Sequence, residues 1–196
     1  MIETELIEGE GALLVIFQEE EFRLPEDIKT SVLLVKNIDW NRDLSPWPAP
    51  RVFKKGENFS GHGSETLEVI LDALKDRKEK ILIAGYSLAG LFALYACTKT
   101  DRFIGCVSAS GSMWFPEFDA WLKSNPVHCQ YVYLSLGDTE KNTRNPLMAM
   151  VEDRTRQAYE IISKQTVCEF EMNPGNHFSD PQGRLLKGIR KALANI

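Results

Sequence analysis

The stretch 81–90 contains a serine in a setting that suits nucleophilic chemistry. Ser87 lies in Gly-Tyr-Ser-Leu-Ala-Gly, a variant of the Gly-x-Ser-x-Gly pattern in which Ala89 takes the second small position and Gly90 follows it. An apolar run precedes this segment and a helix-like run follows it, and this arrangement is typical of a sharp strand-to-helix turn that exposes a serine hydroxyl. The residues two before and two after the serine must be small because strand and helix nearly touch there. We expect Ser87 to be a nucleophile; the alternative is an ordinary turn with an incidental serine.

A serine nucleophile needs a general base, and the chain has only three histidines. His177 lies in a turn-forming Asn-Pro-Gly-Asn-His-Phe stretch, between the last strand-like run and an amphipathic helix predicted over 181–194. This loop position after the last strand makes His177 the expected base. His62 precedes Ser87, against the usual chain order, and is expected in a flexible loop or at a helix start. His128 opens a predicted strand and is expected to be half-buried there.

Two carboxylates compete for the role of orienting the histidine. Asp138 and Glu140 both follow the strand-like run 130–136, in the segment Gly-Asp-Thr-Glu. Glu140 is favoured because it lies a few residues past the glycine that ends the run, whereas Asp138 can cap the turn through its side chain. A serine–histidine dyad without an acid is the remaining alternative.

Short apolar runs alternate with helical segments along the chain, and this order predicts the fold. The expected strands are 12–17, 31–36, 80–85, 104–109, 130–136 and 166–172. The expected helices are a short proline-broken one at 20–29, then 63–77, 87–98, 116–124, 146–164 and 181–194. Runs rich in Val, Ile and Leu that alternate with helices indicate an α/β domain. We expect a mostly parallel sheet of about six strands with helices on both faces. The segment 37–63 is the one long irregular stretch, and such stretches are usually functional or mobile.

Composition agrees with one globular enzyme domain over residues 1–196. Of the 196 residues, 43% are apolar and 26% are charged, which allows a sizeable core. The net charge is −5 and the lysines and arginines are dispersed, so a nucleic-acid partner is not expected. No basic-then-apolar leader and no long apolar run are present, so we expect a cytoplasmic protein that does not cross a membrane. The four cysteines lie among apolar neighbours and are expected to be reduced and buried.

Several segments together resemble a known family. Asn-Arg-Asp-Leu-Ser-Pro at 41–46 and Ser-Gly-Ser-Met-Trp at 110–114 resemble elements of the putative-esterase family, the esterase-D-like α/β-hydrolases. The Ser87, Glu140 and His177 segments fit the same family, whose relatives include siderophore (enterochelin-type) esterases and feruloyl esterases. The resemblance implies a minimal α/β-hydrolase fold. The chain lacks room for the two N-terminal strands of many members, so the sheet is expected to begin with the run 12–17.

The resemblance also implies a function and further site residues. It implies a serine hydrolase that cleaves small-molecule carboxylic esters through a Ser–His–acid triad and an acyl-enzyme intermediate. The oxyanion donors are expected to be the backbone N–H groups of Leu88 and of the loop after the first strand, at Phe17 or Gln18, with Gln18 preferred.

The candidate substrate-binding residues are Trp40, Arg42 and Trp114, while Trp47 is expected to pack against the core. Trp40 and Trp114 could instead pack loops against the core, and for Arg42 a role in holding its loop is favoured over contact with an anionic substrate group. No metal or cofactor is expected, because no His, Cys and Asp residues have ligand spacing. The alternatives are an acyltransferase that uses the same triad and a catalytically silent interaction protein that retains the fold.

Overall fold

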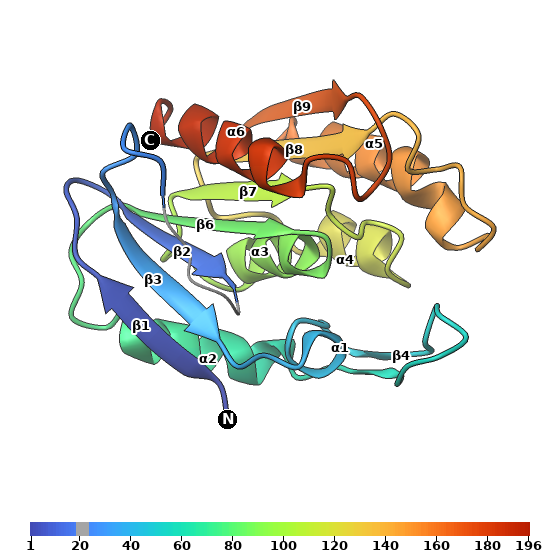
Figure 1. The fold of residues 1–196 in the computed structure, drawn as a ribbon, viewed down its shortest axis with the longest axis horizontal. Helices are drawn as coiled ribbons and strands as arrows, with labels where there is room; N and C mark the ends of the chain where they lie inside the picture. The colour runs from blue at the N-terminus through green and yellow to red at the C-terminus, as the bar shows by residue number, and fades with distance from the viewer. Residues whose placement is uncertain (19–23) are drawn as a thin grey trace.

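A central seven-stranded sheet forms the middle of the molecule (Figure 1). The computed structural model describes residues 1–18 and 24–196. The strands are β1 (Glu3–Ile7), β2 (Leu13–Phe17), β3 (Ser31–Lys36), β6 (Ile81–Tyr86), β7 (Gly105–Ala109), β8 (Tyr131–Gly137) and β9 (Val167–Asn173). Their order in the sheet is β1-β3-β2-β6-β7-β8-β9. All neighbours pair in parallel except β1, which runs antiparallel to β3 at the edge opposite β9 (Figure 1).

The helices cover both faces of this sheet, and the side chains of β2 show the division. Leu13, Val15 and Phe17 join a large core with residues of the helices on one face, while Leu14 and Ile16 join a smaller core with α6 (Pro181–Leu193). The helices of the larger face are α2 (Gly63–Ala73), α3 (Leu88–Lys99), α4 (Phe118–Ser124) and α5 (Val151–Ile162). A strand covered on both faces needs apolar residues at every position, which is why β2 has a continuous apolar sequence.

Smaller elements occupy the long connection between β3 and α2. They are α1 (Trp40–Asp43), β4 (Pro48–Ala49) and β5 (Phe59–Ser60), where β4 and β5 pair as a short antiparallel hairpin. A 3-10 turn, η1 (Met148–Met150), leads into α5. The segment 37–63 was expected to be irregular, and the structure instead shows three short elements within it.

The parallel arrangement brings three strand ends to one edge of the sheet. Ser87 directly follows β6, Glu140 lies three residues past β8, and His177 lies in the loop between β9 and α6. Ligands and reacting groups of open α/β sheets gather at the carboxyl ends of the strands. These three residues therefore meet at one edge although up to 90 positions separate them in the chain.

The six strands expected from the sequence are confirmed, with ends shifted by no more than one residue. The expectation that the sheet begins at 12–17 is wrong, because β1 precedes it and extends the sheet. Every residue of β1 is exposed, so this edge strand has no apolar pattern to predict it. The expected helix at 20–29 is absent over 24–29, which contain a turn, and its first residues lie outside the described part of the chain.

All four cysteines are free thiols. Cys97, Cys106 and Cys129 are buried, whereas Cys168 is only partly buried. None of the helices within residues 1–18 and 24–196 is both long enough and apolar enough to cross a membrane.

Candidate active site

Ser87 occupies a strained turn between β6 and α3. Its backbone has φ 58° and ψ −124°, a conformation that costs a residue with a side chain about 1–3 kcal/mol. A Cβ added to Gly85 would lie 2.2 Å from the carbonyl carbon of Ala89, so only glycine fits there. The Ser87 N–H donates to the Ala109 carbonyl at 3.1 Å, which ties the turn to β7. The close approach of strand and helix expected from the sequence is therefore present.

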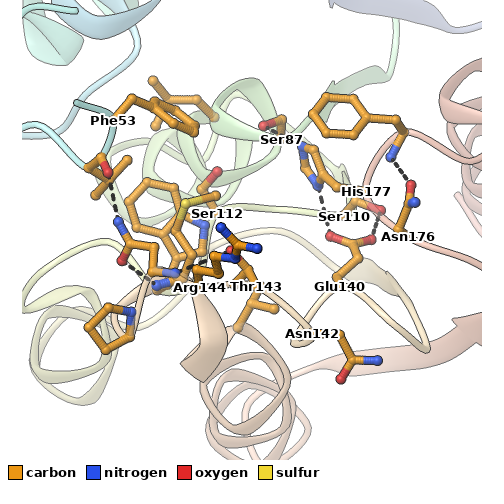
Figure 2. A pocket seen from close by; sticks show the side chains of 18 of the residues that line it. Phe53, Ser87, Ser110, Ser112, Glu140, Asn142, Thr143, Arg144, Asn176 and His177 are labelled. Carbon is orange, nitrogen blue, oxygen red and sulfur yellow. Dashed lines mark hydrogen bonds and ion pairs between the residues drawn. The ribbon is translucent and has the colours of Figure 1, made fainter. Parts of the chain in front are cut away.

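His177 bridges Ser87 and Glu140 (Figure 2). Its Nε2 lies 3.0 Å from Ser87 Oγ, and its Nδ1 lies 2.7 Å from Glu140 Oε2. With the proton on Nδ1 donated to the carboxylate, Nε2 presents a lone pair to the serine hydroxyl. This geometry lets the imidazole accept a proton from Ser87 while the carboxylate stabilises the imidazolium that forms.

Glu140 is a buried carboxylate with a full set of donors. Its Oε1 accepts hydrogen bonds from Ser110 Oγ and from the Gly137 N–H, both at 2.7 Å, and from Arg184 Nη1 at 3.0 Å. Burial raises the pKa of this carboxyl, but the hydrogen bonds from His177, Ser110 and Gly137 outweigh burial and hold the pKa below its ordinary value. Glu140 is therefore ionised at neutral pH.

Asp138, the competing carboxylate, contacts backbone groups and not His177. Its Oδ1 accepts from the Gly175 N–H at 2.8 Å, and its own N–H donates to the Asn173 carbonyl at 2.9 Å. Asp138 thus joins the loop after β8 to the loop after β9, and its side chain is exposed. The structure brings Glu140, and not Asp138, to the histidine.

A large cavity opens beside Ser87. Its volume is about 1080 Å³, slightly above the usual range for small-molecule sites. Ser87, Leu88, Glu140 and His177 line one side of it, and Figure 2 shows Phe53 across the cavity from His177. The aromatic side chains of the lining are Trp40, Phe53, Phe59, Trp114 and Phe178. A mostly apolar cavity that ends at a serine and a histidine is suited to an organic substrate with a polar reacting centre.

Comparison with known proteins places the chain in a family. The family model described as "Putative esterase" matches residues 34–182, more than half of the chain. The chain belongs to the putative-esterase family. It is an enzyme that acts on carboxylic esters. Comparison with curated protein sequences found no significant match.

Solved structures show that this esterase has the fold of α/β-hydrolases. An IroE-like serine hydrolase from Shewanella oneidensis is 15% identical with a TM-score of 0.75, and the match covers 97% of this chain and 75% of that one. The siderophore hydrolase EstA from Aspergillus nidulans is 17% identical with a TM-score of 0.54, over 96% of this chain and 83% of that one. The enterobactin esterase FES from Shigella flexneri is 17% identical with a TM-score of 0.62, over 100% of this chain and 60% of that one.

Two of the three candidate substrate-binding residues line the cavity of the esterase. Trp40 and Trp114 do so, whereas Arg42 does not. The Arg42 side chain is largely exposed, with Nε 3.7 Å from Asp43 Oδ1, and its carbonyl accepts from the His62 N–H. Of the two roles considered for Arg42, these contacts fit the one in holding the loop and not the one in contacting substrate. Trp47 packs in an aromatic cluster, as expected, and its Nε1 donates to the Pro116 carbonyl.

The two expected oxyanion donors of the esterase differ in their surroundings. Leu88 is the first residue of α3 and lines the cavity, and N–H groups in a first helical turn have no intrahelical acceptor. The Gln18 N–H instead donates to the Val35 carbonyl at 3.2 Å, because the ladder between β2 and β3 continues one residue past the strand. Gln18 is therefore not free to serve as expected. The rest of that loop, 19–23, lies outside the described residues.

The other two histidines lie away from the esterase cavity. His62 immediately precedes α2, and its N–H donates to the Arg42 carbonyl. His128 is exposed rather than half-buried, because β8 begins only at Tyr131. Among residues 1–18 and 24–196, no three His, Cys, Asp or Glu side chains gather as a metal site would require.

Two site residues were missed by the sequence analysis. The Tyr86 hydroxyl donates to the His177 carbonyl at 2.6 Å, and burial raises the pKa of this phenol, so it stays neutral. Arg184 reaches Glu140 from α6. A signal for Arg184 existed in the sequence, since it shares a helix face with Gly188 and Ala192, both buried against the sheet.

Proposed function

We propose that this esterase is a serine hydrolase whose triad is Ser87, His177 and Glu140. The observation that carries the proposal is the continuous chain from Ser87 Oγ through His177 to Glu140, at 3.0 and 2.7 Å, beside a cavity of substrate size. An ion pair or a core histidine would not need a serine in a strained backbone conformation at the cavity wall.

The geometry supports a two-step reaction through an acyl-enzyme. Ser87 Oγ attacks the ester carbonyl carbon while its proton passes to His177 Nε2. The tetrahedral intermediate then collapses, the carbon–oxygen bond to the alcohol breaks, and Nε2 returns the proton to the departing oxygen. Water attacks the acyl-enzyme in the same way, with His177 again accepting and returning a proton, and releases the acid.

The developing oxyanion needs donors that are already in place. The Leu88 N–H is the donor next to Ser87, and a single donor of this kind contributes about 3 kcal/mol to transition-state stabilisation. Because Glu140 is ionised and Tyr86 holds the His177 backbone, the imidazole keeps one orientation through both steps.

The substrate class follows from the cavity. Its aromatic lining favours small-molecule esters with an aromatic group, since rings stack on or pack edge-to-face with such walls. The similarity to a siderophore hydrolase and to an enterobactin esterase studied with 2,3-dihydroxy-N-benzoyl-glycine supports this class. A panel of acetyl, benzoyl and feruloyl esters of one common alcohol would measure the preference for the acyl group. We expect kcat/KM to be highest for the esters that carry an aromatic ring.

Active-site labelling tests the nucleophile. A fluorophosphonate probe should label the wild-type protein in a 1:1 ratio, and Ser87→Ala should abolish both labelling and turnover while the melting temperature changes little. Ser112→Ala is the matched control, because Ser112 is another buried serine of the same cavity and should remain labelled. Turnover of esters by Ser87→Ala at the wild-type rate would refute the proposal.

A further inference from the structure

A buried arginine stands behind the proposed triad. Arg184 is 3% exposed, with Nη1 at 3.0 Å from Glu140 Oε1 and 3.2 Å from Ser110 Oγ. Its Nη2 donates to the Pro174 carbonyl at 2.8 Å. Burying a guanidinium is costly unless it is paired, and no step of ester cleavage described above uses this residue. Its placement therefore requires another explanation.

The backbone around Arg184 is shaped to admit it. A Cβ on Gly137 would lie 2.3 Å from the Gly175 carbonyl oxygen and 2.8 Å from Arg184 Nη1, so only glycine leaves room for both the neighbouring loop and the guanidinium. Ser110 has φ 46°, a conformation rarely adopted by residues with a side chain, and its hydroxyl donates to Glu140 Oε1. A required glycine and a strained serine thus meet at the same carboxylate oxygen.

The two oxygens of Glu140 have separate partners. Oε1 accepts from Ser110, Gly137 and Arg184, while Oε2 lies against His177 Nδ1. We infer that Arg184 is a positioning residue of this esterase: it fixes Glu140 through Oε1 and balances its charge, so that Oε2 is presented to His177. The inference rests on the proposed triad, and it assigns to α6 a role in setting the protonation behaviour of the base.

Charge balance gives this inference a measurable consequence. The ionisable groups that face Glu140 are Arg184 from α6, His177 from the preceding loop and Tyr86 from β6, and the phenol of Tyr86 is neutral. Without the guanidinium, the Glu140–His177 pair carries an uncompensated negative charge and holds a proton more tightly. The pH at which the pair gains its proton must then rise, whichever of the two residues carries it.

Histidine NMR of the ¹⁵N-labelled protein tests this directly, because only three histidines contribute signals. In Arg184→Gln we expect the pH midpoint of the His177 ring signals to rise by about one unit, and kcat at pH 7 to fall about 10-fold or more. Arg184→Lys, which keeps the charge, should return the midpoint to the wild-type value but leave kcat reduced, since one ammonium group cannot replace the fork that spans Glu140 and Pro174. Ser110→Ala removes a neutral donor and should lower kcat without a comparable change in the midpoint.

Arg190→Gln is the matched control. Arg190 is on the same helix but is exposed and paired with Asp27, so its loss should change neither the midpoint nor kcat. A wild-type midpoint in folded Arg184→Gln would overturn the inference, and so would a wild-type kcat in Arg184→Lys. If Arg184→Gln does not fold, the kcat of Arg184→Lys tests the inference: a reduced kcat supports it and a wild-type kcat overturns it. The NMR titration needs no turnover, so a failure of the proposed ester chemistry would remain distinguishable from a failure of the role of Arg184.

Discussion

The two sides of the cavity are built differently. On the triad side, Ser87 follows the end of β6 and Glu140 follows the end of β8, while Arg184 lies on α6. Glu140 and Arg184 are almost completely buried. The opposite wall comes from the β4–β5 hairpin loop and the connection 142–148, and its residues are largely exposed. Phe53, for example, is 60% exposed. In the function we propose, the reacting groups are thus held by the sheet and the substrate is recognised by irregular loops, which is the usual division in enzymes built on a fixed scaffold.

Removing the base should have the largest effect on the triad side. We expect His177→Ala to lower kcat/KM by about 10⁵-fold, because Ser87 then has no proton acceptor. His62→Ala and His128→Ala are the controls: both residues lie outside the cavity lining, and both variants should keep most of the activity. Steady-state hydrolysis of a 4-nitrophenyl ester measures all three, and comparable losses in the three variants would contradict the assignment of the base.

The same assignment predicts the pH profile. A histidine accepts a proton only when it is neutral, and its ordinary pKa is about 6.5. The kcat/KM of the wild type should therefore rise with pH as the imidazole loses its proton and then level off. A flat profile between about pH 5 and 9, with chemistry limiting the rate, would contradict a histidine base.

The two carboxylates of the 137–140 turn should differ by orders of magnitude. Glu140→Gln should lower kcat by about 10⁴-fold, because the imidazole loses the acceptor that fixes its tautomer. Asp138→Asn should leave kcat within a few-fold and lower the free energy of unfolding by about 1 kcal/mol, since it weakens only the bond to the Gly175 N–H. The reverse ranking would move the acid to Asp138, and near-full activity in both variants would indicate a Ser87–His177 dyad.

On the loop side the expected effects are small and concern binding. Phe53 is largely exposed and lines the cavity across from His177. Packing part of its ring against a substrate contributes about 1 kcal/mol, so Phe53→Ala should raise the KM of an aryl ester about fivefold and leave kcat within about twofold. Val167→Ala, at an exposed position on β9 outside the cavity lining, should change neither value. A loss in kcat larger than the change in KM would show that the loop side takes part in the chemistry.

The same contrast explains what the sequence could predict. The strands and the turn at Ser87 follow from local patterns, since buried parallel strands need continuous apolar runs and the turn needs Gly85. The choice of Glu140 over Asp138 followed from the spacing after β8. These features depend on residues a few positions apart, so a single sequence contains them.

Other features depend on contacts between distant segments. Strand β1 is exposed throughout and is held by pairing with β3, so its sequence has no apolar periodicity from which a strand could be predicted. Arg184 meets Glu140 across 44 positions, and Arg42 turns to Asp43 rather than to the cavity because of the short helix α1. Only the three-dimensional arrangement shows that the buried Arg184 belongs to the site and that the exposed Arg42 does not.

Trapping the acyl-enzyme tests the central claim most directly. Wild-type protein mixed with an activated aryl ester and quenched in acid within the first turnovers should carry one acyl group by intact mass, and peptide mapping should place it on Ser87. In Ser87→Ala the adduct should be absent. An acyl group on Ser110 or Ser112, or full turnover by Ser87→Ala without any adduct, would contradict the proposed mechanism.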